Sequence, residues 1–359
     1  MLRKPRPNSA GKQNARWNSL CRKCLKPIWN ASNSARNCKH MSTDRCVLIL
    51  GGGGFVGTHL QKALLDRFGA SVRVVNTSRK PQDPALLPLD ITDTEAVRAV
   101  ILREKPTHVI NLVGIASPVA ARRDPALAWE LHALAPERLG QVIREEMPGS
   151  WLFHVSSGLI YGKAALEVDL VDEKTRLEPM DTYSMTKAAG DMALGVLAGE
   201  GLKCIRLRPF NHTGPGQTED FVVPAFAAQL ARISAGLQEP VLRVGNLSAI
   251  RDFLDVRDVV AAYTTLVERS DHLETGAIYN IASGHGHSMR DILDKLIALA
   301  GVPVRVELDP DRQRPSDLPR IVGSTTALAQ AIAWVPTRTI QETLADVLGS
   351  WLKSEESNR

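Results

Sequence analysis

The chain has 359 residues, of which 44% are hydrophobic and 23% charged, so it is long enough to bury a sizeable core. No stretch approaches the roughly 18 consecutive apolar residues of a transmembrane helix, which argues against a membrane protein. The formal net charge is +5, but residues 1–43 contain ten Lys or Arg and no Asp or Glu. The remainder carries 34 basic against 39 acidic residues, so the charge does not indicate a body that binds nucleic acid.

Residues 1–44 form a distinct basic segment, and we expect them to be a disordered extension. The Arg-rich, acid-poor composition is also compatible with a transit peptide, whereas the apolar run of a secretory signal is missing. Cys21-x-x-Cys24 followed by Cys38 and His40 resembles a zinc site, but the spacing is irregular, and we predict no metal. Nothing indicates a disulfide framework, so a cytoplasmic location is expected.

From Arg45 onward, short apolar runs alternate with segments in which apolar residues recur at helical spacing. This β-α-β alternation predicts an α/β fold, a Rossmann-type doubly wound parallel sheet with helices on both faces. The predicted strands are Cys46–Leu50, Ser71–Asn76, Thr107–Val113, Trp151–Ser156 and Lys203–Arg208. The predicted helices between them are Thr58–Phe68, Thr94–Glu104, Leu127–Glu146 and Tyr183–Leu197.

Beyond Gly214 the regular alternation ends, and helical segments are joined by short strands and Pro-rich loops. We expect a smaller C-terminal α/β lobe over the carboxyl edge of the sheet, where such folds bind ligands. The predicted helices here are Val223–Ala235, Asp258–Val267, Met289–Ala300 and Thr339–Leu352. The predicted divisions are a first domain over 45–210, with strands returning after 245, a mainly ligand-binding lobe over 211–352, and a tail over 353–359.

A glycine-rich loop follows the first predicted strand and opens the first predicted helix. Gly51, Gly54 and Gly57 satisfy Gly-x-x-Gly-x-x-Gly, with Phe55 and Val56 between the last two. Such a loop needs glycine to turn tightly, to let backbone N–H groups approach a pyrophosphate, and to pack the helix against the strand. The strand–loop–helix context therefore predicts that the first domain binds NAD(P).

The residues at the end of the second predicted strand indicate which cofactor is bound, because an acidic residue there would bind the ribose 2′-OH of NAD. Here the chain runs Asn76-Thr-Ser-Arg79-Lys80, with two cations and no acid. Because Arg binds a phosphate bidentately, Asn76 and Arg79 favour NADP(H), with NAD(H) as the less preferred cofactor. Asp90 and Ile91 end a later strand-like stretch, and Asp90 would either bind the adenine amino group or cap the next helix.

A second motif, Tyr183-Ser-Met-Thr-Lys187, places a Tyr and a Lys at positions i and i+4 on one face of a predicted helix. A nearby ammonium group lowers the pKa of a phenol, so Tyr183 would exchange a proton with a carbonyl oxygen while a hydride moves at the nicotinamide. Ser157 stands at the end of a predicted strand, directly after Ser156, where its hydroxyl would bind the same oxygen. Together with the glycine loop, these residues predict an NAD(P)-dependent oxidoreductase.

Over residues 45–352 the sequence resembles the extended short-chain dehydrogenase/reductases, in their nucleotide-sugar branch. The motifs that carry the resemblance are Gly51–Gly57, Asp90-Ile91, Asn111-Leu112-Val113, Ser156–Gly162, Tyr183/Lys187, Arg208–Asn211 and Arg251–Phe253. The resemblance implies that Ser157, Tyr183 and Lys187 are the catalytic residues. The cofactor-binding residues that follow from the motifs are Gly51, Gly54, Phe55, Val56, Gly57, Asn76, Arg79, Asp90, Ile91, Leu112, Val113, Tyr183 and Lys187.

Within this branch the sequence is most similar to GDP-6-deoxy-4-ketohexose reductases, over 208–217, over 244–247 running into 251–258, and over 314–317, and the middle stretch is the most specific. The similarity implies NADPH-dependent reduction of the 4-keto group of GDP-4-keto-6-deoxy-D-mannose to GDP-D-rhamnose. The 4,6-dehydratases of the branch carry an acid pair after the catalytic Ser or Thr, where this chain has Gly158 and Leu159. Neither side chain exchanges protons, so dehydration is disfavoured and ketone reduction is not. His132 stands where the family often has Asn.

A nucleotide sugar would bring a diphosphate, which requires cations that stay charged. Arg251 and Arg314 are the candidates, because a guanidinium group matches the phosphate oxygens. Asn211 would hold a sugar or phosphate oxygen, and Asp317 would accept from the ribose or the base. The predicted substrate-binding residues are Ser157, Gly158, Asn211, Arg251, Arg314 and Asp317.

Two other functions share parts of this constellation. A nucleotide-sugar 4-epimerase has the same triad but retains bound NAD, and a non-catalytic NADP-binding regulator is expected to lack the Tyr or the Lys. This chain keeps both residues, which argues against a regulator. By the same resemblance we expect a homodimer built on helices such as Leu127–Glu146 and Tyr183–Leu197, with a GDP-sugar as substrate and neither nucleic acid nor a membrane as partner.

Overall fold

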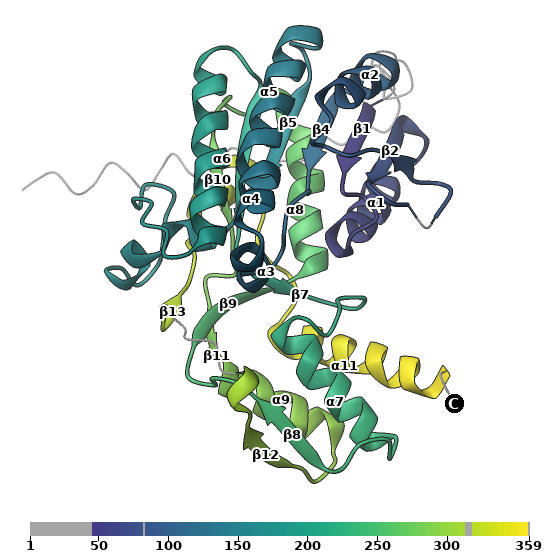
Figure 1. Cartoon of the computed structure of the whole chain (residues 1–359), viewed down its shortest axis with the longest axis vertical. Helices are drawn as coiled ribbons and strands as arrows, with labels where there is room; N and C mark the ends of the chain where they lie inside the picture. Colours follow the sequence, from purple (N-terminus) through teal and green to yellow (C-terminus); the bar gives the residue numbers. More distant parts are fainter. Residues whose placement is uncertain (1–44, 82, 313–317, 358–359) are drawn as a thin grey trace, which may run out of the picture. The chain divides into compact units, whose positions relative to one another are not determined.

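The computed structural model describes residues 45–81, 83–312 and 318–357, and these residues contain a seven-stranded sheet (Figure 1). Its neighbouring strands are all parallel, in the order β10-β6-β5-β4-β1-β2-β3. The strands are β1 (Arg45–Leu50), β2 (Val72–Ser78), β3 (Leu87–Pro88), β4 (His108–Asn111), β5 (Trp151–Val155), β6 (Cys204–Pro209) and β10 (Ile278–Ile281). This sheet confirms the predicted Rossmann-type α/β fold.

Helices cover both faces of the sheet, as its apolar strands require. Residues 46–50 of β1 are all buried, which is typical of a central parallel strand. One core joins the sheet to α1, α8 and α10, and a second core joins its other face to α2, α5 and α6. These helices are α1 (Phe55–Phe68), α2 (Thr94–Glu104), α5 (Ala135–Glu146), α6 (Thr182–Gly199), α8 (Val256–Arg269) and α10 (Thr326–Ile332).

The strand order creates a crevice at the carboxyl end of β1. β1 lies between β2 and β4, and its Ile49 pairs with Asn76 on one side and with Ile110 on the other. At such a switch point the loops after neighbouring strands diverge and leave room for a ligand. The loops after β1 and β4 lie side by side, because a Cβ atom on Gly51 would lie 3.4 Å from the carbonyl carbon of Leu112. The fold therefore places the glycine loop where ligands bind in this architecture.

A second group of elements, here called the C-terminal lobe, follows β6 along the chain. Its helices α7, α9 and α11 share a separate apolar core, β8 pairs with β12, and β9 pairs with β7, β11 and β13. The bounds are β7 (Asn211–Thr213), α7 (Val222–Ser234), β8 (Val241–Val244), β9 (Ile250–Asp255), β11 (Gly286–Ser288), α9 (Met289–Ala300), β12 (Arg305–Leu308), β13 (Arg320–Ile321) and α11 (Ile340–Ser357). Because α8 and β10 return to the large sheet, the lobe is not one continuous segment.

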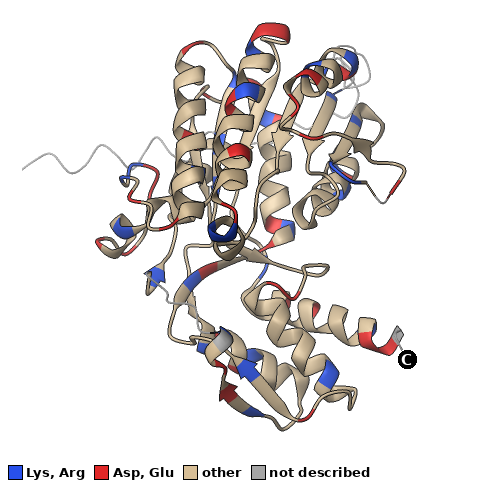
Figure 2. Cartoon of the chain, in the orientation of Figure 1, with Lys and Arg blue, Asp and Glu red and all other residues tan. Residues whose placement is uncertain are grey.

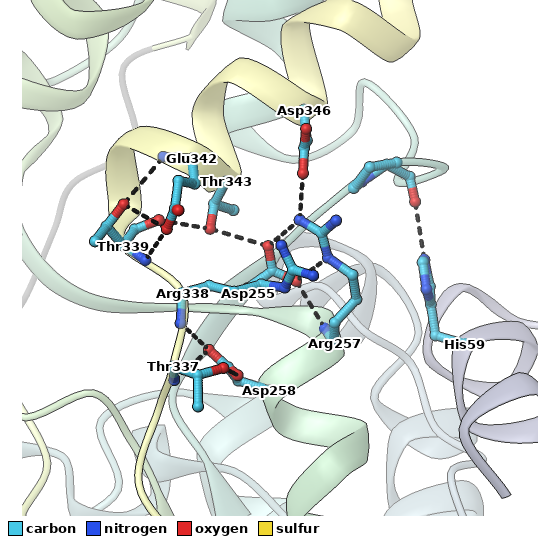
Figure 3. Close-up of polar contacts among 11 residues, drawn as sticks. His59, Asp255, Arg257, Asp258, Thr337, Arg338, Thr339, Glu342, Thr343 and Asp346 are labelled. Atoms are coloured by element: carbon cyan, nitrogen blue, oxygen red, sulfur yellow. Dashed lines mark hydrogen bonds and ion pairs between the residues drawn. The ribbon is translucent and has the colours of Figure 1, made fainter. Parts of the chain in front are cut away.

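A charged cluster fastens α11 to the start of α8 (Figure 3). Asp255, the N-cap of α8, accepts hydrogen bonds from Arg257 Nε at 2.8 Å and from Thr343 Oγ1 at 3.0 Å. Arg257 also pairs with Asp346 on α11 at 2.6 Å. Asp258 accepts two backbone N–H groups from the segment before α11. The cluster thus joins the last helix of the C-terminal lobe to a helix that packs on the large sheet.

Most predicted elements match observed ones to within a few residues, and three differences matter. The helix predicted over Leu127–Glu146 begins at Pro125 as α4 (Pro125–Trp129), and a π-helical segment over Glu130–Leu134 interrupts it before α5. The strand predicted to end at Ser156 ends one residue earlier. Two helices, α10 and α3 (Pro118–Arg123), are not predicted from the sequence, because each spans only about two turns.

Some predicted features lie outside the described residues, namely the basic extension over 1–44 with Cys21, Cys24, Cys38 and His40, and the candidate ligands Arg314 and Asp317. Within the ranges that the structure describes, no helix has the length and apolar character needed to cross a membrane. Basic and acidic residues are interspersed over these helices and strands (Figure 2), in keeping with the nearly balanced charge that follows residue 43.

Candidate active site

The glycine loop turns from β1 into α1 as its motif predicts. Gly51 has a φ of +82°, a conformation that favours glycine, and the Gly54 N–H donates to Gly51 O at 3.0 Å. A Cβ atom on Gly57 would lie 2.5 Å from Gly52 O, so glycine at this position allows α1 to approach the loop closely. Gly54 is the N-cap of α1 and brings no capping side chain. The first N–H groups of α1 therefore face a position suited to a phosphate.

The end of β2 closes one side of this loop. The Gly52 N–H donates to Thr77 O at 2.9 Å, and a Cβ atom on Gly52 would lie 2.5 Å from Asn76 Oδ1. Asn76 is buried, yet its Oδ1 has no hydrogen-bond partner among the described residues. A buried amide oxygen without a partner costs free energy, so such an atom is expected where a ligand donates to it. The cradle of N–H groups and this oxygen together fit a dinucleotide.

Arg79 lies exposed just beyond β2 and acts electrostatically on Asp90. The pKa of Asp90 is lowered mainly by the hydrogen bond from the Thr92 N–H at 3.0 Å, and further by the charge of Arg79. The alternative prediction, that Asp90 caps the next helix, is wrong, because Asp93 caps α2 by accepting from the Ala96 N–H at 3.0 Å. The predicted contact of Asp90 with adenine stays a prediction.

The other predicted cofactor residues surround the loop. Phe55 and Val56 are half-buried in the first turn of α1, and Leu112 and Val113 are half-buried just after β4. Ile91 is buried beyond β3 and packs in the core under α2. These residues come from separate segments of the chain, and the strand order brings them to one edge of the sheet.

Ser157 stands just beyond the end of β5. It is the N-cap of a short 3-10 turn over Gly158–Tyr161, and its Oγ accepts from the Leu159 N–H at 3.2 Å. The Tyr183 side chain is hydrogen-bonded to Ser157. The turn therefore holds the serine hydroxyl at the carboxyl edge of the sheet, against α6.

α6 carries Tyr183 and Lys187 on successive turns. The helix begins with a capping box, in which Asp181 accepts from the Ser184 N–H at 2.7 Å and Ser184 Oγ accepts from the Asp181 N–H at 3.2 Å. Lys187 Nζ donates to Val155 O, at the end of β5, at 3.0 Å. The structure thus brings the three predicted catalytic side chains together.

Burial governs the acid–base properties of these side chains. It lowers the pKa of Lys187 from 10.5 to about 8, and it raises the pKa of Tyr183, against which the hydrogen bond with Ser157 acts. The sequence predicts a pKa of Tyr183 below its usual value, whereas in the structure this pKa lies above it, because loss of water around the phenolate outweighs the other influences; the contribution of Lys187 to it stays a prediction. Tyr183 is therefore a protonated phenol at neutral pH, the form that a proton donor must have.

Apolar groups occupy the two positions where the resemblance places the acids of dehydratases. A Cβ atom on Gly158 would lie 2.9 Å from the Phe210 ring, so an acidic side chain there would require Phe210 to move. Leu159 packs against the small apolar cluster that contains Tyr183 and Ala121. Neither position offers a group that transfers protons.

Two of the predicted substrate residues lie on adjacent strands. Asn211 begins β7, and it pairs with the residue two places after Arg251 on β9. Both side chains belong to half-buried residues. Arg251 Nη1 donates to Ile250 O at 2.8 Å, and burial lowers the pKa of the guanidinium group. The structure thus places these two residues near each other, whereas Arg314 and Asp317 lie outside the described residues.

Three residues of the site are not predicted from the sequence, namely Gly114, Thr186 and Phe210. A Cβ atom on Gly114 would lie 3.0 Å from Lys187 Nζ, and Phe210 fills the space beside Gly158. The available signal is their position, because Gly114 directly follows the Asn111–Val113 motif and Phe210 lies inside the Arg208–Asn211 motif.

The fold and the site define the class of this protein, an NAD(P)-dependent oxidoreductase. A sequence model of the family described as GDP-mannose 4,6 dehydratase matches residues 48–347. The chain therefore belongs to this family of extended short-chain dehydrogenase/reductases, in the nucleotide-sugar branch.

Individual relatives resemble the chain over most of its length. GDP-6-deoxy-D-mannose reductase from Pseudomonas aeruginosa is 33% identical over 310 residues, which cover 85% of this chain and 96% of that protein. The structure of RMD from Pseudomonas aeruginosa complexed with NADPH has a TM-score of 0.77 at 31% identity and covers 86% of this chain and 99% of that one. UDP-glucose 4-epimerase from Thermus thermophilus, in complex with NAD, has a TM-score of 0.73 at 30% identity, with coverage of 85% and 98%.

Proposed function

We propose that this chain reduces the 4-keto group of GDP-4-keto-6-deoxy-D-mannose to GDP-D-rhamnose, which is GDP-6-deoxy-D-mannose, with NADPH as the reductant. The observation that carries the proposal is a buried, protonated Tyr183 beside Ser157 and Lys187, next to positions 158 and 159 that lack acids. The similarity to a relative named GDP-6-deoxy-D-mannose reductase supports this choice of substrate.

The nicotinamide cofactor, when bound, supplies the hydride. Tyr183 gives its phenolic proton to the oxygen at C4 of the sugar, and its raised pKa keeps that proton in place until the transfer. Ser157 orients the same oxygen through its hydroxyl. Below about pH 8 Lys187 keeps a positive charge at Nζ, and this charge stabilises the phenolate left after the transfer.

The cofactor would be held by the loops after β1, β2 and β4. The N–H groups of the loop over 51–57 would bind the pyrophosphate, and the unpartnered Asn76 Oδ1 would accept from the nucleotide. Arg79 supports NADPH over NADH, because its exposed guanidinium group suits a 2′-phosphate. Leu112 and Val113 would line the pocket beside Gly51.

The GDP-sugar would lie over β7 and β9, in front of Ser157 and Gly158. Arg251 supports a diphosphate there, because a guanidinium group keeps its charge even when burial lowers its pKa. Asn211 on the neighbouring strand would hold a sugar or phosphate oxygen. Arg314 and Asp317 remain proposed ligands from outside the described residues.

A reduction assay tests the function. NADPH and freshly generated GDP-4-keto-6-deoxy-D-mannose are mixed with the protein, and loss of NADPH absorbance is followed together with the sugar product. We expect NADPH consumption with GDP-D-rhamnose as product, and no turnover by Tyr183→Phe, which should still bind the cofactor. Absence of NADPH consumption together with interconversion of UDP-glucose and UDP-galactose would instead make the protein a 4-epimerase. A protein that binds NADPH and turns over none of these sugars would be a regulator.

We also propose that the protein is a homodimer. Met185, Met192 and Val196 are exposed at positions i, i+7 and i+11 of α6, so they form an apolar stripe on one face of that helix. Leu134, on the adjoining π-helical segment, is exposed as well. Light scattering should give twice the chain mass of 39.2 kDa, and Met192→Glu should give the monomer.

We further propose that the protein is located in the cytoplasm. Cys46 and Cys204 are buried and form no disulfide within the part of the chain that the structure describes, which suits a reducing compartment.

A further inference from the structure

His132 lies where three parts of the site meet. Its side chain is fully buried on the π-helical segment over Glu130–Leu134, a rare geometry that often occurs at functional sites. Its ring packs edge-to-face on the Tyr183 ring, with centroids 5.4 Å apart and an interplanar angle of 84°. A Cβ atom on Gly114 would lie 3.0 Å from Lys187 Nζ and 3.1 Å from His132 Cδ2. The imidazole of His132 and the ammonium group of Lys187 therefore both lie next to Gly114, in the turn after β4.

The hydrogen bonds of His132 favour one of its two neutral tautomers. His132 Nε2 lies 2.9 Å from the Ile115 N–H and 3.1 Å from the Ile115 carbonyl oxygen; because the first contact is the shorter and a backbone N–H only donates, we assign Nε2 as the nitrogen without a proton. The ring proton is therefore on Nδ1, from which it is donated to Thr186 Oγ1 at 2.8 Å. The Thr186 hydroxyl in turn donates to Thr182 O at 2.8 Å. A chain of hydrogen bonds thus leads from the turn after β4, through the imidazole, into the first turn of α6.

The surroundings keep this ring neutral. Burial lowers the pKa of His132 to about 3, and the positive charge of Lys187 on α6 acts in the same direction. His154 on β5 also lowers the pKa of His132, whereas the Ile115 carbonyl, 3.1 Å from Nε2, raises it. The donor and acceptor roles of the two ring nitrogens are therefore fixed over the physiological pH range.

The backbone of His132 contacts α6 a second time. A Cβ atom on Gly190 would lie 2.0 Å from His132 O, so the π-helical segment and α6 touch backbone to backbone. The side chain holds Thr186 and the carbonyl group abuts Gly190, and these two residues lie on either side of Lys187 in the sequence. His132 thus fixes α6 on both sides of the catalytic lysine.

We propose that His132 is a positioning residue for the reduction. Its imidazole holds the Tyr183–Lys187 face of α6 against the Gly114–Ile115 turn, which directly follows the strand that borders the cofactor loop. A misplacement of about 1 Å at a reacting group costs up to roughly 100-fold in rate, so a residue that sets this distance affects turnover without touching the substrate. The kinetic part of this inference rests on the proposed function.

Two substitutions separate positioning from general stability. His132→Phe keeps a ring beside Tyr183 but removes both hydrogen bonds, whereas His132→Asn retains a donor and an acceptor. The matched control is His108→Phe, at the other end of β4, where a buried histidine bonds to Ser270 Oγ at 3.0 Å and stacks on Phe153. We expect kcat to fall roughly 10- to 100-fold in H132F, with KM and NADPH affinity changed less than about threefold. H132N should recover most of kcat, and H108F should keep kcat while losing comparable thermal stability.

A wild-type kcat in H132F, or equal losses of kcat in H132F and H108F, would overturn the proposal. Nitrogen-15 NMR of histidine-labelled protein adds a readout that needs no substrate, with assignment from the missing signal of H132F. We expect a neutral ring protonated on Nδ1 between about pH 6 and 8, and a ring protonated on Nε2 or on both nitrogens would contradict the hydrogen-bond chain. If the wild-type protein reduces no sugar, the proposed function fails, and the NMR result still decides whether His132 links the two elements.

Discussion

Burial controls the charges of the single residues that we propose as catalytic. Tyr183 and Lys187 both lie under the surface on one helix, and loss of water disfavours the charged form of each. The pKa of the phenol therefore rises while that of the ammonium group falls to about 8. The two groups thus combine a phenol that keeps its proton with a lysine that titrates close to neutral pH.

The buried Lys187 should make stability depend on alkaline pH. Its pKa is about 8 in the folded protein and 10.5 ordinarily, so the full cost of burying the charge is present below pH 8 and is relieved between pH 8 and 10.5. Such a shift corresponds to about 3 kcal/mol. Urea unfolding should show that the free energy of unfolding of the wild type rises by about that amount relative to Lys187→Met over this range.

The control for this titration is Lys174→Met, because Lys174 is exposed. The difference between the wild type and Lys174→Met should stay constant over the same pH range. If the difference between the wild type and Lys187→Met is equally constant, then the ammonium group of Lys187 is not buried in the way that we describe.

Arg79 should decide between the two nicotinamide cofactors. Loss of hydrogen bonds to a charged phosphate costs about 1.5–3 kcal/mol, so Arg79→Ser should raise KM for NADPH roughly 10- to 100-fold and leave KM for NADH nearly unchanged. Steady-state rates with each cofactor measure this. Arg67→Ser is the control, because Arg67 lies at the end of α1 and pairs with Glu268 at 2.6 Å. Equal losses with both cofactors in Arg79→Ser would refute a specific phosphate contact.

Among the elements, the π-helical segment before α5 is one that the spacing of apolar residues does not predict. Apolar spacing continues across Leu127–Glu146, and a single wide turn adds too small a change of period to be read from it. The sequence does hold one signal, because Pro136 would break a continuous helix, and in the structure it lies in the first turn of α5. The interruption places His132 on Tyr183, so the missed detail is part of the site.

The close approach of α6 to this segment gives a prediction with a control in the same helix. A Cβ atom on Gly190 would lie 2.0 Å from His132 O, whereas Gly199 has nothing within 4 Å of its Cβ position. Gly190→Ala should therefore force the two elements apart and lower the free energy of unfolding by about 1–3 kcal/mol, with a loss of kcat. Gly199→Ala should change stability by less than about 0.5 kcal/mol. Urea unfolding and initial rates would detect both effects. If Gly190→Ala changed neither the free energy of unfolding nor kcat, the close contact between α6 and the π-helical segment would be excluded.

Local motifs explain how much of the site the sequence predicts. The glycine loop and the Tyr183–Lys187 pair each depend on residue spacing within a short segment, so they can be recognised in the sequence before the fold is known. The contact of Phe210 with Gly158 joins positions about 50 residues apart and depends on the packing of β6 beside β5. Residue spacing along the sequence does not predict such packing. It does not predict the hydrogen bond between His132 and Ile115 either.

In the molecule as a whole, different parts of the chain provide the groups proposed to bind the cofactor, donate the proton and bind the substrate. The loops after β1, β2 and β4 form the proposed cradle for the cofactor, β5 and α6 bring the proposed proton donor, and β7 and β9 bring the candidate substrate ligands. All of these meet at the carboxyl edge of one sheet, where a doubly wound fold binds its ligands. The cluster around Asp255 and Arg257 joins the C-terminal lobe to this sheet (Figure 3), so the substrate side is anchored to the cofactor side.

Transfer of deuterium tests the central claim, reduction of a sugar 4-ketone, most directly. The protein is supplied with GDP-4-keto-6-deoxy-D-mannose and NADPH that carries deuterium at the transferable position of the nicotinamide, and the product sugar is analysed by NMR. We predict one deuterium atom at C4 of GDP-D-rhamnose, and no such product from Tyr183→Phe. Deuterium that stays on the cofactor, or that appears at another carbon of the sugar, would contradict the account.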